Sequence, residues 1–125
     1  MKKLILLSLF VLLSCGEVPR NFIEPTKEQL ETISSGFTGN IVVEDYCAIK
    51  STDFDNVYFI ALRLSKEYKT LNTKEDIGIG VWGVGGSGGS CYSANDIAKE
   101  NSLYPGGVVS MIDDGAIDVK NCLNK

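Results

Sequence analysis

The first residues of the chain constrain its folding most, because they have the pattern of an export signal. Lys2 and Lys3 precede an almost unbroken apolar run, Leu4–Leu13, in which Ser8 is the only polar residue. A transmembrane helix needs roughly 17–25 apolar residues, so this run is too short to span a bilayer and is typical of a secretion signal. We assign residues 1–14 to a signal peptide, which leaves 111 of the 125 residues to fold. A chain of that length forms one small domain with a modest core.

The end of the apolar run, Leu12-Leu13-Ser14-Cys15, resembles the bacterial lipobox. The resemblance implies that signal peptidase II cleaves before Cys15, whose sulfur then carries a diacylglyceryl group with acyl chains such as palmitate. One acyl chain binds a membrane only marginally, but two or three together make a stable anchor. We therefore expect a bacterial lipoprotein of the cell envelope, outside the cytoplasm, with membrane lipid as a partner. Gly16 replaces the Asp that marks inner-membrane retention in enteric bacteria, which favours the outer membrane where the host has one.

Charge and the absence of histidine exclude several classes of function. The chain contains no histidine, which excludes a Ser-His-Asp triad, a Cys-His pair and an imidazole metal site. Removal of Lys2 and Lys3 with the signal changes the formal net charge from −4 to −6. Such a chain has no basic stripe to neutralise phosphates, so nucleic acid is not an expected partner. We expect no metal and no cofactor beyond the covalent lipid on Cys15.

Three cysteines remain after Cys15, namely Cys47, Cys91 and Cys122. An exported chain in an oxidising compartment pairs the cysteines that it can, and three cysteines allow one bridge. The sequence leaves the three pairings open. We favour Cys47–Cys122, which would hold the C-terminus to a strand, with Cys91 as a small buried residue. Cys91 is also the best candidate nucleophile, since a helix start follows it and can lower a thiol pKa, but it has no histidine base.

Hydrophobic periodicity predicts an α+β domain. Residues 15–38 contain the lipidated cysteine, a tether and a short helix opened by a Thr26-x-x-Gln29 capping box. Residues 39–125 form the α+β domain, with about five antiparallel strands and two or three short helices packed on the sheet. The expected strands are 41–47, 57–64, 77–84, 90–92 and 108–112. The expected helices of this domain are 94–100, capped by Ser93, and a last helix from Asp113 or Asp114 through Cys122.

The faces of these strands carry further information. Val57–Leu64 is apolar on both faces, which predicts a central strand covered on both sides. In the first strand, Ile41, Val43 and Cys47 are expected to share one face. The adjacent Glu44 and Asp45 are expected to point to opposite faces, so they would not act as a pair. Gly78 and Gly80 would let a helix or an aromatic ring lie close to the third strand.

The remaining patterns are weaker. The glycine run of 78–89 matches G-x-G-x-x-G twice, but neither match lies at the first turn of a βαβ unit, which a dinucleotide site needs. Asp53-x-Asp55 lacks the rest of a calcium loop, and Asp113-Asp114 is better explained as helix capping. Three aromatic residues are candidates either for a recognition patch or for the core: Trp82, Tyr92 and Tyr104.

Four segments between Cys47 and Cys122 resemble small, uncharacterised exported bacterial proteins and lipoproteins: DFDNVYFIALRL (53–64), IGIGVWGV (77–84), YSANDIAKENS (92–102) and DDGAIDVKNC (113–122). The shared order is a Tyr-Phe strand, a Gly-Val-Trp strand, an Ala-Lys-Glu helix, and Asp-Asp-Gly-Ala followed by a late Cys. The resemblance implies a fold and no chemistry. The chain departs from it in the glycine-rich loop 85–89 and at Cys91, where an aliphatic residue is expected, which supports Cys91 as the unpaired cysteine.

These observations predict an envelope lipoprotein that acts as a non-catalytic binding domain tethered at Cys15. A narrower version is an inhibitor or superinfection-exclusion lipoprotein that binds a phage or envelope protein. The alternative of another class is a small thiol-dependent enzyme that uses Cys91.

Overall fold

The computed structural model describes residues 21–68, 70–87 and 89–124. These residues form one antiparallel sheet of four strands in the order β1-β2-β3-β4. The strands are β1 (Ile41–Lys50), β2 (Val57–Tyr68), β3 (Thr73–Gly85) and β4 (Cys91–Ser93), and the helices are α2 (Lys27–Ser35), α3 (Asp96–Asn101) and α4 (Ala116–Leu123). The predicted α+β class is confirmed, with four strands in the described residues where about five were expected. None of the described helices is long and apolar enough to cross a membrane.

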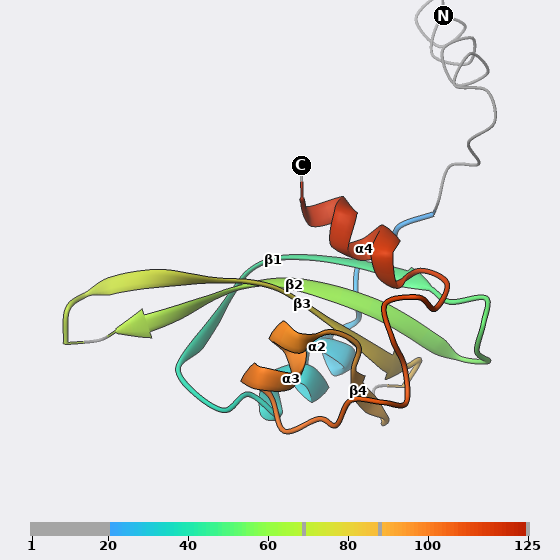
Figure 1. Cartoon of the computed structure of the whole chain (residues 1–125), viewed down its shortest axis with the longest axis horizontal. Coiled ribbons are helices and arrows are strands. Elements are labelled where there is room, and N and C mark those ends of the chain that lie inside the picture. Colours follow the sequence, from blue (N-terminus) through green and yellow to red (C-terminus); the bar gives the residue numbers. More distant parts are fainter. Residues whose placement is uncertain (1–20, 69, 88, 125) are drawn as a thin grey trace, which may run out of the picture.

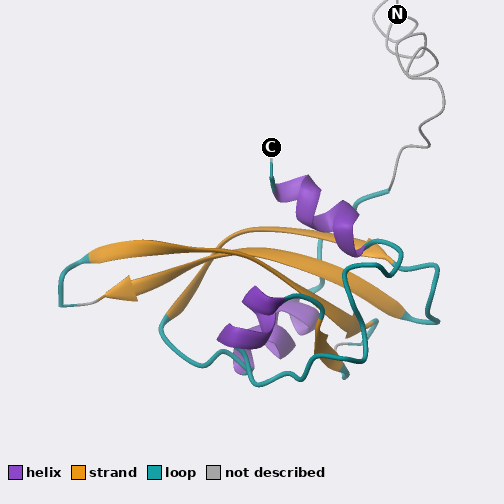
Figure 2. Ribbon diagram, viewed as in Figure 1, coloured by secondary structure: helices purple, strands orange, loops and turns teal. Residues whose placement is uncertain are grey.

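The helices cover both faces of the sheet, which gives three layers. Helix α4 lies on one face, whereas α2 and α3 lie on the other (Figures 1 and 2). Two apolar clusters fill the spaces between the layers. The cluster beneath α4 includes Phe59, Ala61, Val81 and Val119. The cluster on the α2–α3 face consists of Ile33, Ala48, Ile60, Leu62, Leu64, Trp82, Val84, Cys91 and Ala98.

Strand β2 is an interior strand, as its sequence predicts. Phe59 and Ala61 belong to the α4 cluster, and Ile60 and Leu62 to the opposite cluster. All four side chains are fully buried. A strand that is covered by helices on both sides needs apolar residues on both faces, and β2 has them.

The prediction that Ile41, Val43 and Cys47 share a face is wrong, because β1 contains a bulge. Val43 pairs with Leu64 and Asp45 with Arg63, so Glu44 is an extra residue in the ladder. A bulge of one residue reverses the faces of every residue that follows. As a result, Val43 packs on the α2–α3 side, whereas Cys47 lies beneath α4.

The glycines of β3 provide room for both an aromatic ring and a helix, the two neighbours that the sequence suggested. A Cβ added to Gly80 would lie 2.6 Å from Cη2 of Trp82 and 3.4 Å from Cα of Ala98 in α3. Gly78 has a φ of +120° and faces Ile97 of the same helix. A second irregularity in the ladder lies at this point, where Ile77 is the extra residue between the partners of Leu64 and Ser65.

Residues 65–76, which lie between the expected strands 57–64 and 77–84, form the outer part of a long hairpin. β2 and β3 remain paired out to Tyr68 and Thr73, and Asn72 in the connecting turn has a φ of 51°. This ribbon projects beyond the helices at one end of the molecule (Figure 1). Both faces of the ribbon are exposed to solvent, so its sequence lacks the alternation of apolar and polar residues that identifies a half-buried strand.

Three further boundaries differ from the prediction. Residues 108–112 are a loop in which only Val109 is buried, whereas Val108 is 55% and Ile112 91% exposed. The cap of α3 is Asn95, whose side chain accepts from the N–H of Ala98, and not Ser93. Helix α4 starts at Ala116 after Gly115, not at Asp113 or Asp114.

Candidate functional site

A groove between α2 and the N-terminal half of β1 is the candidate site. Its volume is about 750 Å³. Four apolar or aromatic residues contribute to its lining: Pro25 and Leu30 from the α2 side, and Val43 and Tyr46 from β1. Four charged residues do so as well: Lys27, Glu31, Glu44 and Asp45. We call it the α2–β1 groove.

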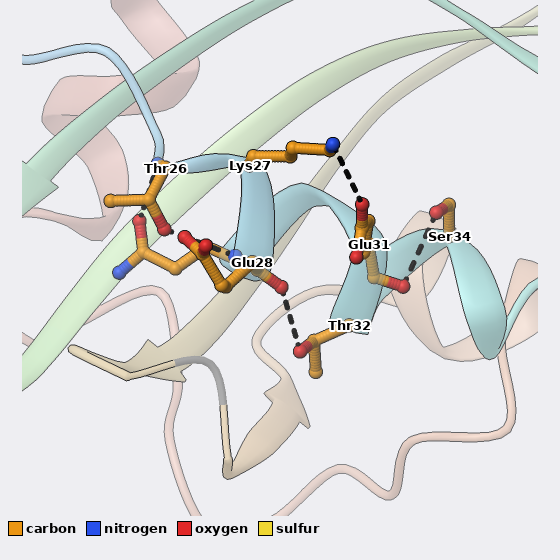
Figure 3. Close-up of polar contacts among 7 residues, drawn as sticks. Thr26, Lys27, Glu28, Glu31, Thr32 and Ser34 are labelled. Carbon is orange, nitrogen blue, oxygen red and sulfur yellow. Dashed lines mark hydrogen bonds and ion pairs between the residues drawn. The ribbon is translucent and has the colours of Figure 1, made fainter.

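Local sequence signals hold α2 in place beside the groove. The predicted capping box is present, since the side chains and backbone N–H groups of Thr26 and Gln29 bond reciprocally. Figure 3 shows this cap together with the exposed Lys27–Glu31 ion pair, whose charged atoms are 3.9 Å apart. The buried Gln29 also donates a 3.2 Å hydrogen bond to the carbonyl of Gly85 at the end of β3.

The C-terminal half of α2 is fixed by apolar and aromatic contacts. Ile33 is fully buried in the cluster beneath the helix. The Tyr104 hydroxyl donates to the carbonyl of Thr32, and the tyrosine ring packs against Gly36, where a Cβ would be 2.4 Å from the ring. Helix α2 therefore belongs to the folded unit, although the sequence groups it with the tether.

The β1 side of the groove is the free edge of the sheet. Farther along this edge, Ile23 pairs with Ala48 through backbone bonds of 2.8 and 3.2 Å. The chain then leaves the edge at Pro25 and turns into α2. Tyr46 has the same orientation in the ladder as Ala48, so its N–H and C=O point away from β2. The Asp45 carboxylate accepts the Tyr46 N–H at 2.8 Å.

The bulge places two carboxylates in the groove that the sequence assigned to opposite faces. Glu44 and Asp45 both line the groove, because the extra residue interrupts strand alternation. Glu44 forms an ion pair of 3.3 Å with Lys74 from the hairpin. Among the described residues, Asp45 has no ion pair. With Glu31, the described part of the lining contributes three carboxylates and the ammonium of Lys27.

The three aromatic residues do not form one recognition patch. Trp82 is fully buried, and its indole N–H donates to Ser102 Oγ at 3.1 Å. Tyr104 packs partly buried on the α2–α3 side, and Tyr92 packs partly buried against the cluster on the opposite face. The core interpretation of Trp82 is therefore correct. Tyr92 does line a separate cavity of about 280 Å³ beside the glycine-rich loop, together with Phe54 and Val108.

Cys91 is a free, buried cysteine of β4. Burial raises the pKa of its thiol to about 12. We expected a following helix to lower the pKa of the Cys91 thiol. This effect is absent because α3 begins only at Asp96, after β4 has ended. A thiol with this pKa is almost entirely protonated at neutral pH, which makes it a poor nucleophile.

The favoured disulfide is present and joins β1 to α4. Cys47 and Cys122 are bonded across a sequence separation of 75 residues, with Cα atoms 6.4 Å apart. The guanidinium of Arg63 also donates to the carbonyl of Leu123, the last residue of α4. A cation at a helix C-terminus interacts favourably with its exposed carbonyls. Together these contacts attach α4 to the sheet.

The acidic pairs connect loops and do not gather into a metal site. The Asp114 carboxylate accepts from the N–H and the hydroxyl of Thr52, and Asp53 accepts from the N–H of Asp114 at 2.6 Å. The expected capping role of 113–114 is wrong, because the N-cap of α4 is Gly115 without a side-chain cap bond, and Asp113 accepts from the N–H of Ser110. The described residues contain no group of three or more acidic, cysteine or histidine side chains that could hold a metal ion.

The sequence signals did not predict the α2–β1 groove. The capping box of Thr26 predicted the helix. The position of the helix beside β1 depends on contacts between residues that are far apart in the chain. Comparison with protein-family models, curated proteins and solved structures finds no significant match to this chain.

Proposed function

We propose that this protein is a lipid-anchored binding domain of the bacterial envelope, attached through Cys15 and acting on a partner protein without catalysis. The observation that carries the proposal is the Leu12-Leu13-Ser14-Cys15 motif at the end of a short apolar run. Cys15 and the signal peptide 1–14 lie outside the described residues, so the anchor rests on this sequence pattern.

The position of the chain start supports a tethered arrangement. The first described residues, drawn in blue, lie at the end of the molecule opposite the β2–β3 hairpin (Figure 1). The six residues from Gly16 to Asn21 span at most about 20 Å when fully extended. An anchor at Cys15 would therefore keep the domain close to the bilayer, with the hairpin able to point away from it.

The disulfide supports an oxidising location. A covalent loop of 75 residues stabilises a domain by about 4 kcal/mol in the chain-entropy model. Such bonds persist in exported proteins and are rare in the cytosol. A domain of this size has little stability to spare, so the contribution is substantial.

The α2–β1 groove supports binding as the mode of action. It combines apolar and aromatic side chains with charged ones at an open surface, and protein interfaces likewise have an apolar centre with a polar rim. The alternative of a thiol-dependent enzyme is disfavoured by the burial and raised pKa of Cys91. The narrower proposal, an inhibitor or exclusion factor directed at a phage or envelope protein, rests on small size and membrane attachment.

Metabolic labelling with radioactive palmitate tests the anchor. We expect the wild-type chain to be labelled and to sediment with membranes, and globomycin to cause the precursor to accumulate. Cys15→Ser should abolish the label, whereas the matched variant Cys91→Ser should keep it. A Cys15→Ser chain that retains label and membrane attachment would refute the proposal.

A further inference from the structure

We propose that the α2–β1 groove binds an extended, cationic segment of a partner protein, in which lysine or arginine alternates with apolar residues. This inference rests on the proposed function and specifies the chemistry of the partner. It is carried by the edge of β1, by the apolar lining and by the charge of the groove.

The edge of β1 already binds one extended segment. Ile23 both donates to and accepts from Ala48, as an added antiparallel strand does. The chain leaves this edge at Pro25, which has no N–H to donate. The next outward-facing position is Tyr46, whose N–H is satisfied by Asp45 and whose carbonyl remains directed away from β2. An extended partner that donates an N–H there would continue the arrangement.

The length of the groove fits a short extended segment. Its lining runs along α2 from Lys27 to Ser34, and eight helical residues extend about 12 Å. An extended chain advances about 3.3 Å per residue, so roughly four residues would occupy this length. Alternate side chains of such a segment point the same way, which lets apolar ones contact Leu30, Val43 and Tyr46. Tyr46 is 41% exposed and available for that contact.

The charge of the groove selects a cationic occupant. The described lining contributes the carboxylates of Glu31, Glu44 and Asp45 and the ammonium of Lys27, and the ammonium of Lys74 reaches Glu44 from the hairpin, so the carboxylates are in excess by one. Among the described residues, Glu31 pairs with Lys27 and Glu44 pairs with Lys74, and such surface ion pairs contribute little free energy, so a basic ligand can replace them at little cost. Basic side chains between the apolar ones point to the other side of the segment, the side of Asp45, and add to the charge attraction between the segment and the carboxylates of the groove.

The same features disfavour two other occupants. A second copy of this chain would present the same carboxylates to the groove, and like charges repel. An anionic membrane surface would be repelled for the same reason of charge.

A peptide-binding measurement tests the inference. The protein would be purified from membranes in dodecyl maltoside and titrated into a fluorescein-labelled, amidated peptide of alternating leucine and lysine. Fluorescence anisotropy would report Kd, with detergent alone subtracted and a leucine–glutamate peptide as the counterpart. We expect saturable binding of the lysine peptide, weakening with added salt, and none of the glutamate peptide.

Variants locate the binding. Glu31→Lys should raise Kd about tenfold, whereas Glu100→Lys on α3, outside the groove, should leave it unchanged. Tyr46→Ser should weaken binding, and Leu103→Ser, at a 76% exposed position elsewhere, should not. Thermal melts would show that each variant is folded. Equal Kd values for Glu31→Lys and Glu100→Lys, or equal binding of both peptides, would overturn the inference. Because palmitate labelling does not depend on the groove, such a result would leave the proposed anchor standing.

Discussion

The indole ring of Trp82 lies against Gly80, two residues earlier on the same face of β3. A Cβ at Gly80 would be 2.6 Å from Cη2 and 2.8 Å from Cζ3 of the indole. The ring is enclosed on its other sides, with Phe37 at 6.0 Å between ring centroids and Ser102 bonded to its N–H. Because Trp82 is fully buried, it has little room to move away.

Gly80→Ala should therefore destabilise the domain by about 1–3 kcal/mol, the usual cost of overpacking a filled core. The measurement is the midpoint of urea unfolding followed by tryptophan fluorescence. Gly39→Ala is the matched control, since a Cβ at Gly39 would have nothing within 4 Å. Similar midpoints for the two variants would show that the ring does not need the glycine.

Removal of the disulfide should lower the free energy of unfolding by about 4 kcal/mol in the chain-entropy model. The double variant Cys47→Ala/Cys122→Ala avoids an unpaired partner and should unfold at a much lower urea concentration. Thiol counting provides a second readout. In the lipidated chain, denaturation without reductant should expose only the Cys91 thiol, and reduction should add Cys47 and Cys122. Full thiol reactivity before reduction would contradict the pairing.

Cys91 should make stability depend on alkaline pH. Burial raises the pKa of this thiol to about 12 in the folded protein, against an ordinary value of 9.0. Between these values the unfolded chain loses the proton and the folded chain keeps it, so unfolding is favoured as pH rises. The stability that depends on the protonated Cys91 thiol is fully present below about pH 9 and is lost progressively toward pH 12.

The difference in stability between wild type and Cys91→Ala isolates this effect from other groups that titrate at high pH. Urea unfolding at several pH values should show the wild type losing stability faster than the variant above pH 9. Iodoacetamide should also modify Cys91 slowly in the folded protein and rapidly after unfolding. Parallel pH curves with rapid modification of the folded protein would be inconsistent with a buried thiol.

The capping box of α2 should contribute measurably to stability. Thr26 accepts the Gln29 N–H at 3.1 Å, and loss of an N-cap side chain typically costs about 1 kcal/mol. Thr26→Ala should lower the thermal midpoint, whereas Thr70→Ala, in the exposed hairpin turn, should change it little. A midpoint for Thr26→Ala that equals the control would show that the tertiary contacts of Gln29, Ile33 and Tyr104 hold the helix without the cap.

Sequence patterns predicted the elements whose signals are local. The two apolar faces of β2 identified an interior strand, and Thr26 with Gln29 identified the start of α2. The bulge at Glu44 was not visible, because it depends on the register with β2 and reverses the faces beyond it. The outer hairpin was missed because strand pairing there does not bury an apolar face.

The candidate site was less predictable than the fold. Trp82, Tyr92 and Tyr104 share an aromatic composition suited to recognition, but burial and opposite faces separate them. The α2–β1 groove instead depends on where a short helix packs beside a sheet edge. Its fixing contacts, from Gln29 to Gly85 and from Tyr104 to Thr32, join residues far apart in the chain. Local periodicity contains no information about such contacts.

Intact-mass spectrometry of the protein purified from bacterial membranes tests the central claim most directly. A lipid-anchored domain predicts a chain that begins at Cys15 and carries the added mass of a diacylglyceryl group. A chain that retains residues 1–14, or one that begins at another residue with an unmodified Cys15 thiol, would contradict the account.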